Sequence, residues 1–404
     1  MIVCLQIPRF ALTVAVGREA LLSAPLALAP EAGREPVVGE PSAAAETQGV
    51  RAGMRLGEAL ARCPGLRLVP PDPAGVADAH DRLLAALEGI GAAVEAGRPG
   101  LAFFDAHALR HLHGDLAGVI AVARRAAGRP ARIGAGPTRF AALAAASRAR
   151  ARRAEVFGPD LRAVQRALAA LPVDLLVTFA EGRGEHADIA LAALPEPLRR
   201  LGVSTLGELA TLPRAAVADR FGAVGLRARE LARGKDVPLR PREPVEQLQE
   251  ELELPESASG PQLEQALGLL VDRLLARRER RGRALRAAVV SAVLVEGGTW
   301  RDRMTFREPL TDPRRMRLVL APKLAGLPAP AEVLRLRAEG FGPPTGAQGA
   351  LVEEPASARA ERLREAVRQT RVAAGPDAAL RVLEVDPDSR VPERRLVLAP
   401  WETA

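Results

Sequence analysis

A change in sequence pattern near residue 160 constrains the fold more than any other feature of this chain. Before it, short apolar runs that predict strands, such as residues 1–7, GLAFFD (100–105) and ARIGAG (131–136), alternate with segments of helical spacing. After it, residues 160–234 carry only helical patterns, which Gly and Pro interrupt. Because a strand-and-helix unit and an all-helical unit bury their apolar faces differently, the chain contains at least two domains.

The first domain is predicted to be a layered α/β or α+β unit over residues 1–159. Amphipathic spacing predicts helices over 81–96, 115–128 and 138–153 between the apolar runs. A small segment with its own helix, LGEALARC, ends at PPDP, where a helix cannot continue. We therefore expect a sheet domain that carries an inserted subdomain at about 11–73.

Two short helix–turn–helix units are predicted within residues 160–236. LPEPLRRLGVSTLGELATLP turns at Gly202, with Thr205 placed to cap the next helix, and VADRFGAVGLRARELARGKD turns around Gly222 and Gly225. Backbone N–H groups at such turns suit phosphate oxygens. An ordinary helical bundle has the same spacing, so both interpretations stay open.

The Pro-rich segment VPLRPREP (237–244) is a linker to a further strand-and-helix domain at about 245–340. There QLEQALGLLVDRLLARRERRGRAL predicts one long helix, and AAVVSAVLVEGGTWRDRMTF predicts a hairpin around its Gly-Gly pair. A second helix near 313–325 and a strand near 332–338 follow. The remaining tail is predicted to hold one amphipathic helix at 357–373.

Charge points to an anionic partner such as nucleic acid. The net charge of the 404-residue chain is +8, and residues 262–340 alone hold 16 Arg or Lys against 9 Asp or Glu. Part of that excess fits an ordinary solvated helix face.

The two cysteines form no CxxC pair, and the start of the chain lacks signal-peptide character. No apolar run reaches transmembrane length, so we expect a cytoplasmic protein without membrane contact.

Three of the five histidines follow Asp105 in GLAFFDAHALRHLHG. His107 and His111 are four residues apart, a spacing that places ligands on one helical face and favours a metal-dependent hydrolase. However, neither HExxH nor a matching distant ligand set accompanies them, and His113 fits only if the helix is broken. We therefore interpret the three as surface or helix-start residues.

The order of these parts, with several local motifs, resembles the Y-family translesion DNA polymerases. The matching pieces are GVRAGMRLGEALARCPGLRLVPPDP in the fingers, GAGPTRFAALAAAS in the palm, and LRRLGVSTLGELA and FGAVGLRARELARGKD in the thumb. The resemblance implies a multi-domain α+β right hand: a palm at 1–159 with fingers at about 11–73, a helix-hairpin-helix thumb at 160–236, a little finger at 245–340 and a C-terminal interaction tail at 341–404.

The catalytic positions of that family are replaced in this chain. Two-metal nucleotidyl transfer needs carboxylates that hold Mg²⁺ between the attacking oxygen and the triphosphate. The resemblance places those carboxylates at Ile7, Gly100 and Leu101, and a frequent further acid at Arg9. The residues that contact the triphosphate fall on Ala43, Glu46 and Leu143. The combined replacement argues that the palm does not polymerise and needs no metal or other cofactor.

A polymerase-shaped chain without a metal site resembles the ImuB-type proteins, catalytically inactive Y-family relatives in damage-inducible (SOS) operons. The resemblance implies a nucleoid-associated scaffold for DNA repair that links the sliding clamp to an error-prone C-family polymerase and a RecA-like accessory protein. The candidate clamp-binding peptide is QGALV, where Gln348 and Leu351 keep the expected offset but Val352 replaces the usual final aromatic residue. An ordinary linker is the alternative.

A scaffold of this kind would bind damaged or primer–template DNA through its thumb and little finger. Besides the turn glycines, the candidate backbone-binding residues are Arg227, Arg229, Arg283, Arg286, Arg301 and Arg303. Each also fits an ordinary surface arginine. The alternative function is an active Y-family polymerase with a relocated metal site, for which Asp105 and Asp115 are the nearby acids.

Overall fold

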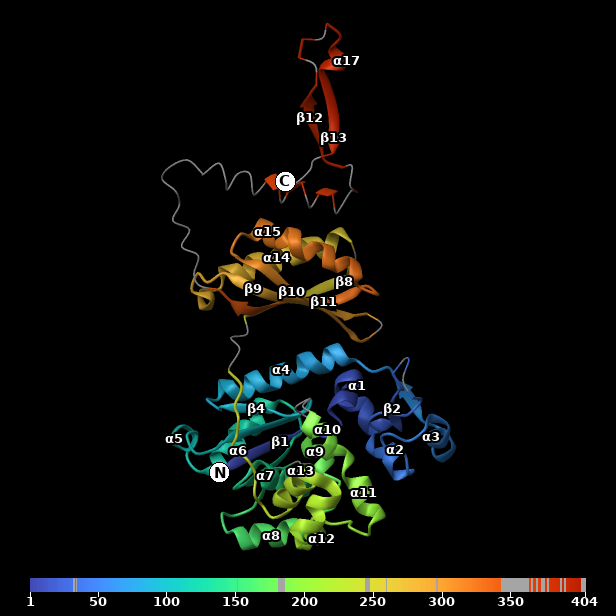
Figure 1. Cartoon of the computed structure of the whole chain (residues 1–404), viewed down its shortest axis with the longest axis vertical. Coiled ribbons are helices and arrows are strands. Elements are labelled where there is room, and N and C mark those ends of the chain that lie inside the picture. Colours follow the sequence, from blue (N-terminus) through green and yellow to red (C-terminus); the bar gives the residue numbers. More distant parts are fainter. Residues whose placement is uncertain are drawn as a thin grey trace. The chain divides into compact units, whose positions relative to one another are not determined.

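The computed structural model describes residues 1–342 except 32, 34, 151, 181–185, 244–247, 259 and 296, and residues 363–400 except 365, 368, 369, 372–374, 376, 377, 386 and 389. The chain divides into two compact units, residues 1–344 and 345–404 (Figure 1). None of the helices within the described ranges is long and apolar enough to cross a membrane.

A five-stranded sheet of order β4-β5-β1-β6-β7 forms the centre of the palm region. The strands are β1 (Ile2–Gln6), β4 (Val94–Ala96), β5 (Leu101–Asp105), β6 (Arg132–Gly136) and β7 (Glu155–Val156). Central β1 pairs antiparallel with β5 and β6, whereas β6 pairs parallel with β7. Both faces of β1 are apolar, since Val3 and Leu5 enter one core and Cys4 enters the other.

Helices cover both faces of this sheet. Helices α4 (Pro73–Gly89) and α6 (Leu116–Ala127) pack on the Val3 and Leu5 side, while α7 (Arg139–Arg148) and the thumb helices pack on the Cys4 side. The helix predicted over 81–96 is wrong at both ends. Asp72 caps α4, which begins at Pro73, and a turn at Gly91 follows its last residue, Gly89. Likewise α7 stops at Arg148 rather than continuing to 153.

The inserted fingers segment is a small unit of short elements. It consists of α1 (Phe10–Ser23), β2 (Leu26–Leu28), α2 (Ala43–Thr47), α3 (Leu56–Arg62) and β3 (Arg67–Val69). Strands β2 and β3 are parallel, and the side chains of Ala45, Val50 and Cys63 help to form its core. The helix predicted from LGEALARC is α3.

The described residues of the thumb region form helices and no strand, as predicted. These are α8 (Leu161–Ala169), α9 (Leu175–Ala180), α10 (His186–Ala193), α11 (Pro195–Arg200), α12 (Leu206–Thr211) and α13 (Arg214–Ala232). Thr205 caps α12 in a capping box with Glu208, which confirms the first predicted unit. In the second unit Gly222, at φ 59°, breaks α13 into two segments.

The little-finger region is a four-stranded antiparallel sheet of order β10-β9-β11-β8 with helices on one face. Its strands are β8 (Gln249–Ala258), β9 (Leu285–Leu294), β10 (Thr299–Leu310) and β11 (Ala331–Phe341), and its helices are α14 (Pro261–Ala276) and α15 (Pro313–Leu320). The Gly-Gly hairpin is confirmed, with both glycines at positive φ. The long helix over 262–285 is wrong, since α14 ends at Ala276 and a short 3₁₀ turn (Arg278–Arg280) leads into β9.

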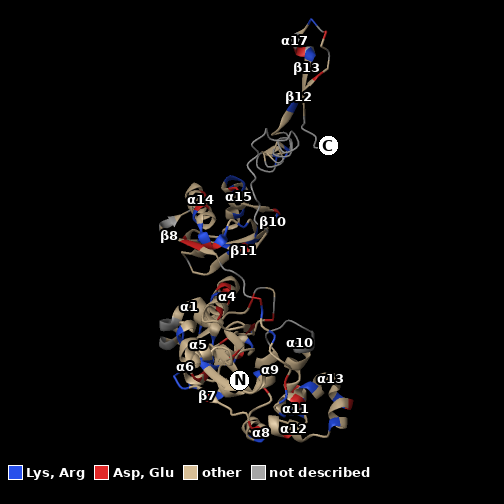
Figure 2. Cartoon of the chain, turned by 90° about the vertical axis from the view of Figure 1, so that its left-hand side faces the viewer, with Lys and Arg blue, Asp and Glu red and all other residues tan. Residues whose placement is uncertain are grey.

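Strand β8 was not predicted from the sequence, although Leu248, Leu252 and Leu254 pack against the core on alternate positions. It brings Glu250, Glu251 and Glu253 to the sheet, so the module is less basic than residues 262–340 alone (Figure 2). Together these elements confirm the α+β fold class.

Residues 345–404 form the second unit. Strands β12 (Leu380–Glu384) and β13 (Leu396–Pro400) pair antiparallel, with the short helix α17 (Pro392–Arg395) between them. The predicted helix 357–373 lies largely outside the described residues, as does the peptide Gln348–Val352.

Candidate functional site

Strands β1 and β5 bring the predicted metal-ligand positions together. Gln6 is the register partner of Leu101, and the Ile7 N–H donates to the Gly100 carbonyl at 2.8 Å. Ile7 therefore lies beside Gly100 at the same end of the strand pair. The structure assembles the positions that the resemblance selected, but it assembles them from apolar residues.

Position 100 has no room for an acidic side chain in this backbone. Its φ is +81°, and a Cβ atom built there would lie 2.6 Å from the Cβ of Phe10. The side chains of Ile7 and Leu101 are 5% and 1% exposed and belong to the two palm cores. The Gly100 N–H donates to His80 Nδ1 at 3.2 Å, and burial lowers the pKa of that imidazole. The side chains at these positions therefore belong to the hydrophobic core of the palm.

This set of residues does not fit a bound Mg²⁺ ion. Mg²⁺ takes oxygen ligands in octahedral geometry, and Ile7, Gly100 and Leu101 offer no side-chain oxygen. Within the described part of the chain, no group of three or more His, Cys, Asp or Glu side chains has the arrangement of a metal site.

Asp105 lies at the opposite end of the strand pair. It is the register partner of Ile2, roughly 17 Å along the strand from Ile7. Its carboxylate accepts from the N-terminal ammonium at 3.1 Å and from the His107 N–H at 3.0 Å. Burial raises the pKa of Asp105, but these two donors lower it more, so the net shift is downward. Asp115 caps α6 by accepting from the Gly118 N–H.

Arg9 and Glu46 form an ion pair with each other. At these two positions the polymerase resemblance leads us to expect an acid and an arginine respectively, so the chain carries the two charges in exchanged places. Arg9 also donates from Nε to the Pro41 carbonyl at 2.9 Å and adopts a left-handed backbone, with φ 51°. The ion pair links the segment just after β1 to α2 of the fingers.

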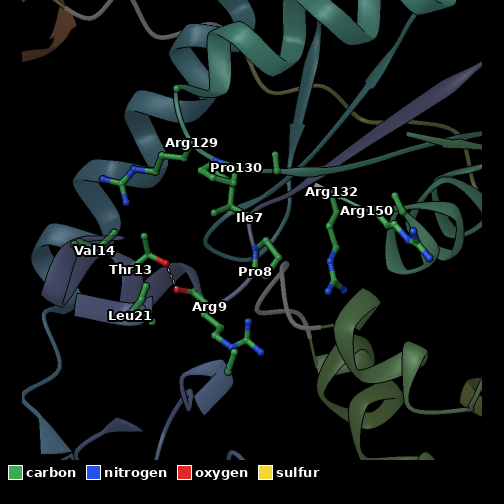
Figure 3. Close-up of a pocket in the computed structure, with 15 residues that line it drawn as sticks. Ile7, Pro8, Arg9, Thr13, Val14, Leu21, Arg129, Pro130, Arg132 and Arg150 are labelled. Atoms are coloured by element: carbon green, nitrogen blue, oxygen red, sulfur yellow. Dashed lines mark hydrogen bonds between the residues drawn. The ribbon is translucent and has the colours of Figure 1, made fainter. Parts of the chain in front are cut away.

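A basic pocket of about 680 Å³ opens at this end of β1. Figure 3 shows Arg9, Arg129, Arg132 and Arg150 around Ile7 and Pro8. Ala43, one of the predicted triphosphate positions, also lines it, whereas Leu143 is fully buried in α7 and does not. Sequence reasoning identified Arg9 but missed the other three arginines, which come from separate elements and have no local motif.

The three histidines do not form a site in the described region. The rings of His107 and His111 make an edge contact, with centroids 6.3 Å apart. His113 Nε2 instead lies 3.0 Å from the Ile90 carbonyl oxygen, in a hydrogen bond.

The predicted DNA-binding residues of the thumb lie at its two turns. Gly202, at φ +78°, follows α11, and Gly222 is exposed at the break in α13. Gly225 is buried, and a Cβ atom built there would lie 2.4 Å from the Cβ of Phe221. Arg229 donates from Nε to the Leu212 carbonyl at 2.8 Å, so this side chain joins α13 to the end of α12. Arg227 lies on the same segment.

The predicted little-finger arginines Arg301 and Arg303 project from the sheet face opposite α14 and α15. Arg301 pairs with Asp78 at 3.1 Å and with Glu339 at 3.2 Å, and Arg303 pairs with Glu339 at 2.7 Å. Sequence reasoning missed Arg337, which lies between Asp81 and Glu339 at 3.1 and 2.8 Å. Burial raises the pKa of Glu339, but its arginine partners lower it more, so the net shift is downward.

The remaining two candidates differ in their surroundings. The Arg283 guanidinium lies 4.3 Å from the centre of the Phe341 ring and donates to the Arg280 carbonyl, whereas Arg286 is exposed on β9. All these arginine assignments stay predictions.

The structure has a mainly antiparallel palm sheet, an inserted fingers unit, a helix-hairpin-helix region and a four-stranded sheet module in this order, which is the α+β right-hand arrangement expected from the sequence. Residues 5–147 match the model of the impB/mucB/samB family. The match covers the palm and fingers regions of this chain and ends before the thumb region.

The DNA polymerase IV of Moorella thermoacetica is 29% identical over 244 residues, which cover 58% of this chain and 57% of that protein. The chain thus spans little more than half the length of this relative. Among solved structures, DinB from Sulfolobus solfataricus has a TM-score of 0.46 and a Dbh ternary complex one of 0.44. Each is 18% identical, and each match covers 84% of this chain and 99% of the other.

Proposed function

We propose that this protein is a non-catalytic Y-family homologue that acts as a DNA-binding scaffold in damage-induced, error-prone translesion synthesis. The observation that carries the proposal is the end of β1, where Ile7, Gly100 and Leu101 meet without a carboxylate. Two-metal transfer requires acids at that place. The positive φ and tight packing at Gly100 also leave no room for one to be added.

The nearby acids do not restore such a site. Asp105 is held at the far end of the sheet by the N-terminal ammonium and the His107 N–H, and Asp115 is used as a helix cap. An active polymerase with a relocated metal site therefore has no supporting contact among these residues.

Primer extension tests the loss of catalysis. We expect the full chain, supplied with Mg²⁺ or Mn²⁺ and all four deoxynucleotides, to add no nucleotide to a primer–template, while an active DNA polymerase IV extends it in parallel. Templated extension that Asp105→Ala abolishes would overturn the proposal, and Asp115→Asn serves as the matched variant.

DNA binding is the activity that the proposal retains. The thumb turns present exposed backbone at Gly202 and Gly222, and the net charge of +8 favours polyanions. If phosphate contacts dominate, the association constant for a primer–template should fall steeply with salt and depend little on sequence. Fluorescence anisotropy at several salt concentrations measures both properties, and salt-independent binding would contradict this part.

The protein partners form the last part of the proposal. We propose that the tail recruits the sliding clamp through Gln348 and Leu351, and that the scaffold joins an error-prone C-family polymerase and a RecA-like accessory protein at the nucleoid. A pull-down from DNA-damaged cells, with the full chain and with a chain lacking 341–404, tests it. Recovery of clamp and polymerase should require the tail; equal recovery without it would refute this role.

A further inference from the structure

The basic pocket at the end of β1 has a lining that the lost metal site does not explain. Its described lining residues include Arg9, Arg129, Arg132 and Arg150 but no Asp or Glu. These arginines come from the β1–α1 junction, the α6–β6 loop, the start of β6 and the segment after α7. A cavity of about 680 Å³ is within the range that holds small ligands.

Three of these guanidinium groups have no carboxylate partner in the described structure. Arg9 is paired with Glu46, but no ion pair is found for Arg129, Arg132 or Arg150 among the described residues. The Arg129 guanidinium lies 6.0 Å from the centre of the Phe10 ring, a cation–π contact that does not neutralise its charge. Like charges around one cavity repel each other, so an anion that enters it is stabilised by all three.

The geometry points to a binding site for a ligand with adjacent phosphate groups, which we propose the arginines hold directly and without a divalent metal. Planar guanidinium groups recognise phosphate oxygens through paired hydrogen bonds. This inference rests on the proposed function, because a palm that bound two metals here would need acids where Ile7 and Arg9 stand. Pro8, Val14, Leu21 and Ala43 supply an apolar wall beside the arginines, against which a sugar or base can lie.

A metal-free site reverses the usual effect of magnesium. In a two-metal polymerase Mg²⁺ brings the triphosphate to the palm. Here Mg²⁺ would neutralise the phosphates that the arginines attract, so it should weaken binding. The sign of the magnesium effect therefore separates this pocket from a conventional nucleotide site.

Calorimetric titration of the full chain with inorganic triphosphate, in EDTA and then in excess Mg²⁺, tests the proposal. We expect saturable binding in EDTA, weaker binding in Mg²⁺, and at least a tenfold loss of affinity in the combined variant Arg129→Gln, Arg132→Gln, Arg150→Gln. Arg110→Gln, an exposed arginine on α5 (Arg110–His113) outside the pocket, should bind like the wild type. Absence of binding, binding only with Mg²⁺, or equal loss in the control would overturn the proposal.

The phosphates can come from a free nucleotide or from a single strand of DNA. ATP and a six-residue oligothymidylate are therefore added as competitors of triphosphate in EDTA. Displacement by the oligonucleotide assigns the pocket to a DNA strand, and displacement by ATP alone assigns it to a nucleotide. Circular dichroism of the triple variant checks that it is folded. Primer extension tests the proposed function separately. Templated synthesis would refute that function regardless of whether triphosphate binds to the pocket.

Discussion

Two groups of arginines in this molecule have opposite surroundings. In the palm pocket, Arg129, Arg132 and Arg150 have no carboxylate partner within the described structure. On the little-finger sheet, Arg301 and Arg337 are held by acids from both their own sheet and α4. The same side chain is thus presented to solvent in one region and already neutralised in the other.

The difference shows that an arginine count does not measure the capacity to bind phosphate. Arg301 was selected from the sequence because of its basic neighbours, yet in three dimensions its nearest partners are Asp78 and Glu339. Arg132 was not selected, although Arg129 lies three residues before it, yet it lines a cavity without acids among the described residues. DNA that reaches the little-finger sheet must compete with carboxylates, whereas an anion in the palm pocket meets no such competitor among the described lining residues.

The largest effect is expected from restoring an acid beside the palm pocket. Gly100→Asp places a side chain at φ +81° against Phe10, so strain and overpacking should lower the free energy of unfolding by about 3–4 kcal/mol. Urea denaturation followed by circular dichroism measures the loss. Gly57→Ala, where a Cβ has open space, should differ little from the wild type. A stable Gly100→Asp variant would show that the site had kept room for a ligand.

The second prediction concerns the little-finger sheet, where arginines are paired with carboxylates. Arg337 is 7% exposed and is shared by Asp81 and Glu339. Arg337→Met should cost about 2 kcal/mol of unfolding free energy, because Asp81 and Glu339, both partly buried, each lose one of their arginine partners. Arg315→Met removes an exposed arginine on α15 and should change stability only slightly. Equal effects in thermal or urea unfolding would mean that the sheet arginines are not held as the structure places them.

A smaller effect is expected when the competing acids on α4 are removed. Asp78→Asn combined with Asp81→Asn should free Arg301 and Arg337 from α4, although both still pair with Glu339. We expect affinity for primer–template DNA to rise about fivefold, or roughly 1 kcal/mol. Glu308→Gln combined with Glu332→Gln changes the net charge equally at exposed sites. If anisotropy shows the same gain for both pairs, the effect is one of net charge and not of released arginines.

The smallest effect is a pH dependence carried by Glu339. Its arginine partners place its folded pKa below the ordinary value of 4.5. The ion pairs therefore stabilise the fold above pH 4.5 and are lost as the pH falls through the lower folded pKa. Glu339→Gln should flatten the decline in unfolding free energy between pH 6 and pH 3.5, while exposed Glu332→Gln should not. An unchanged slope in Glu339→Gln would contradict the assigned pairing.

Local patterns predicted most of the elements, and long-range contacts account for the errors. Thr205 with Glu208 signals a helix start within four residues, and the structure has that capping box. Strand β8 was missed because its alternating leucines are separated by glutamates, whose charges are matched by Arg277 and Arg335 in other strands or turns. The predicted long helix failed at Ala276, where the chain must turn to enter the sheet.

For the candidate site as well, some features follow from the sequence and others only from the tertiary structure. The sequence by itself determined that Ile7, Gly100 and Leu101 carry no side-chain oxygen, which holds whatever the fold. Only the tertiary structure decided that these residues meet at one end of β1 while Asp105 lies at the other, because strand register sets that distance.

The tertiary structure also decided which arginines are available. Whether a guanidinium group is compensated depends on carboxylates that are distant in sequence, such as Asp78 for Arg301. A linear pattern records the charges but not their separation, and the strength of an electrostatic interaction depends on that separation and on burial.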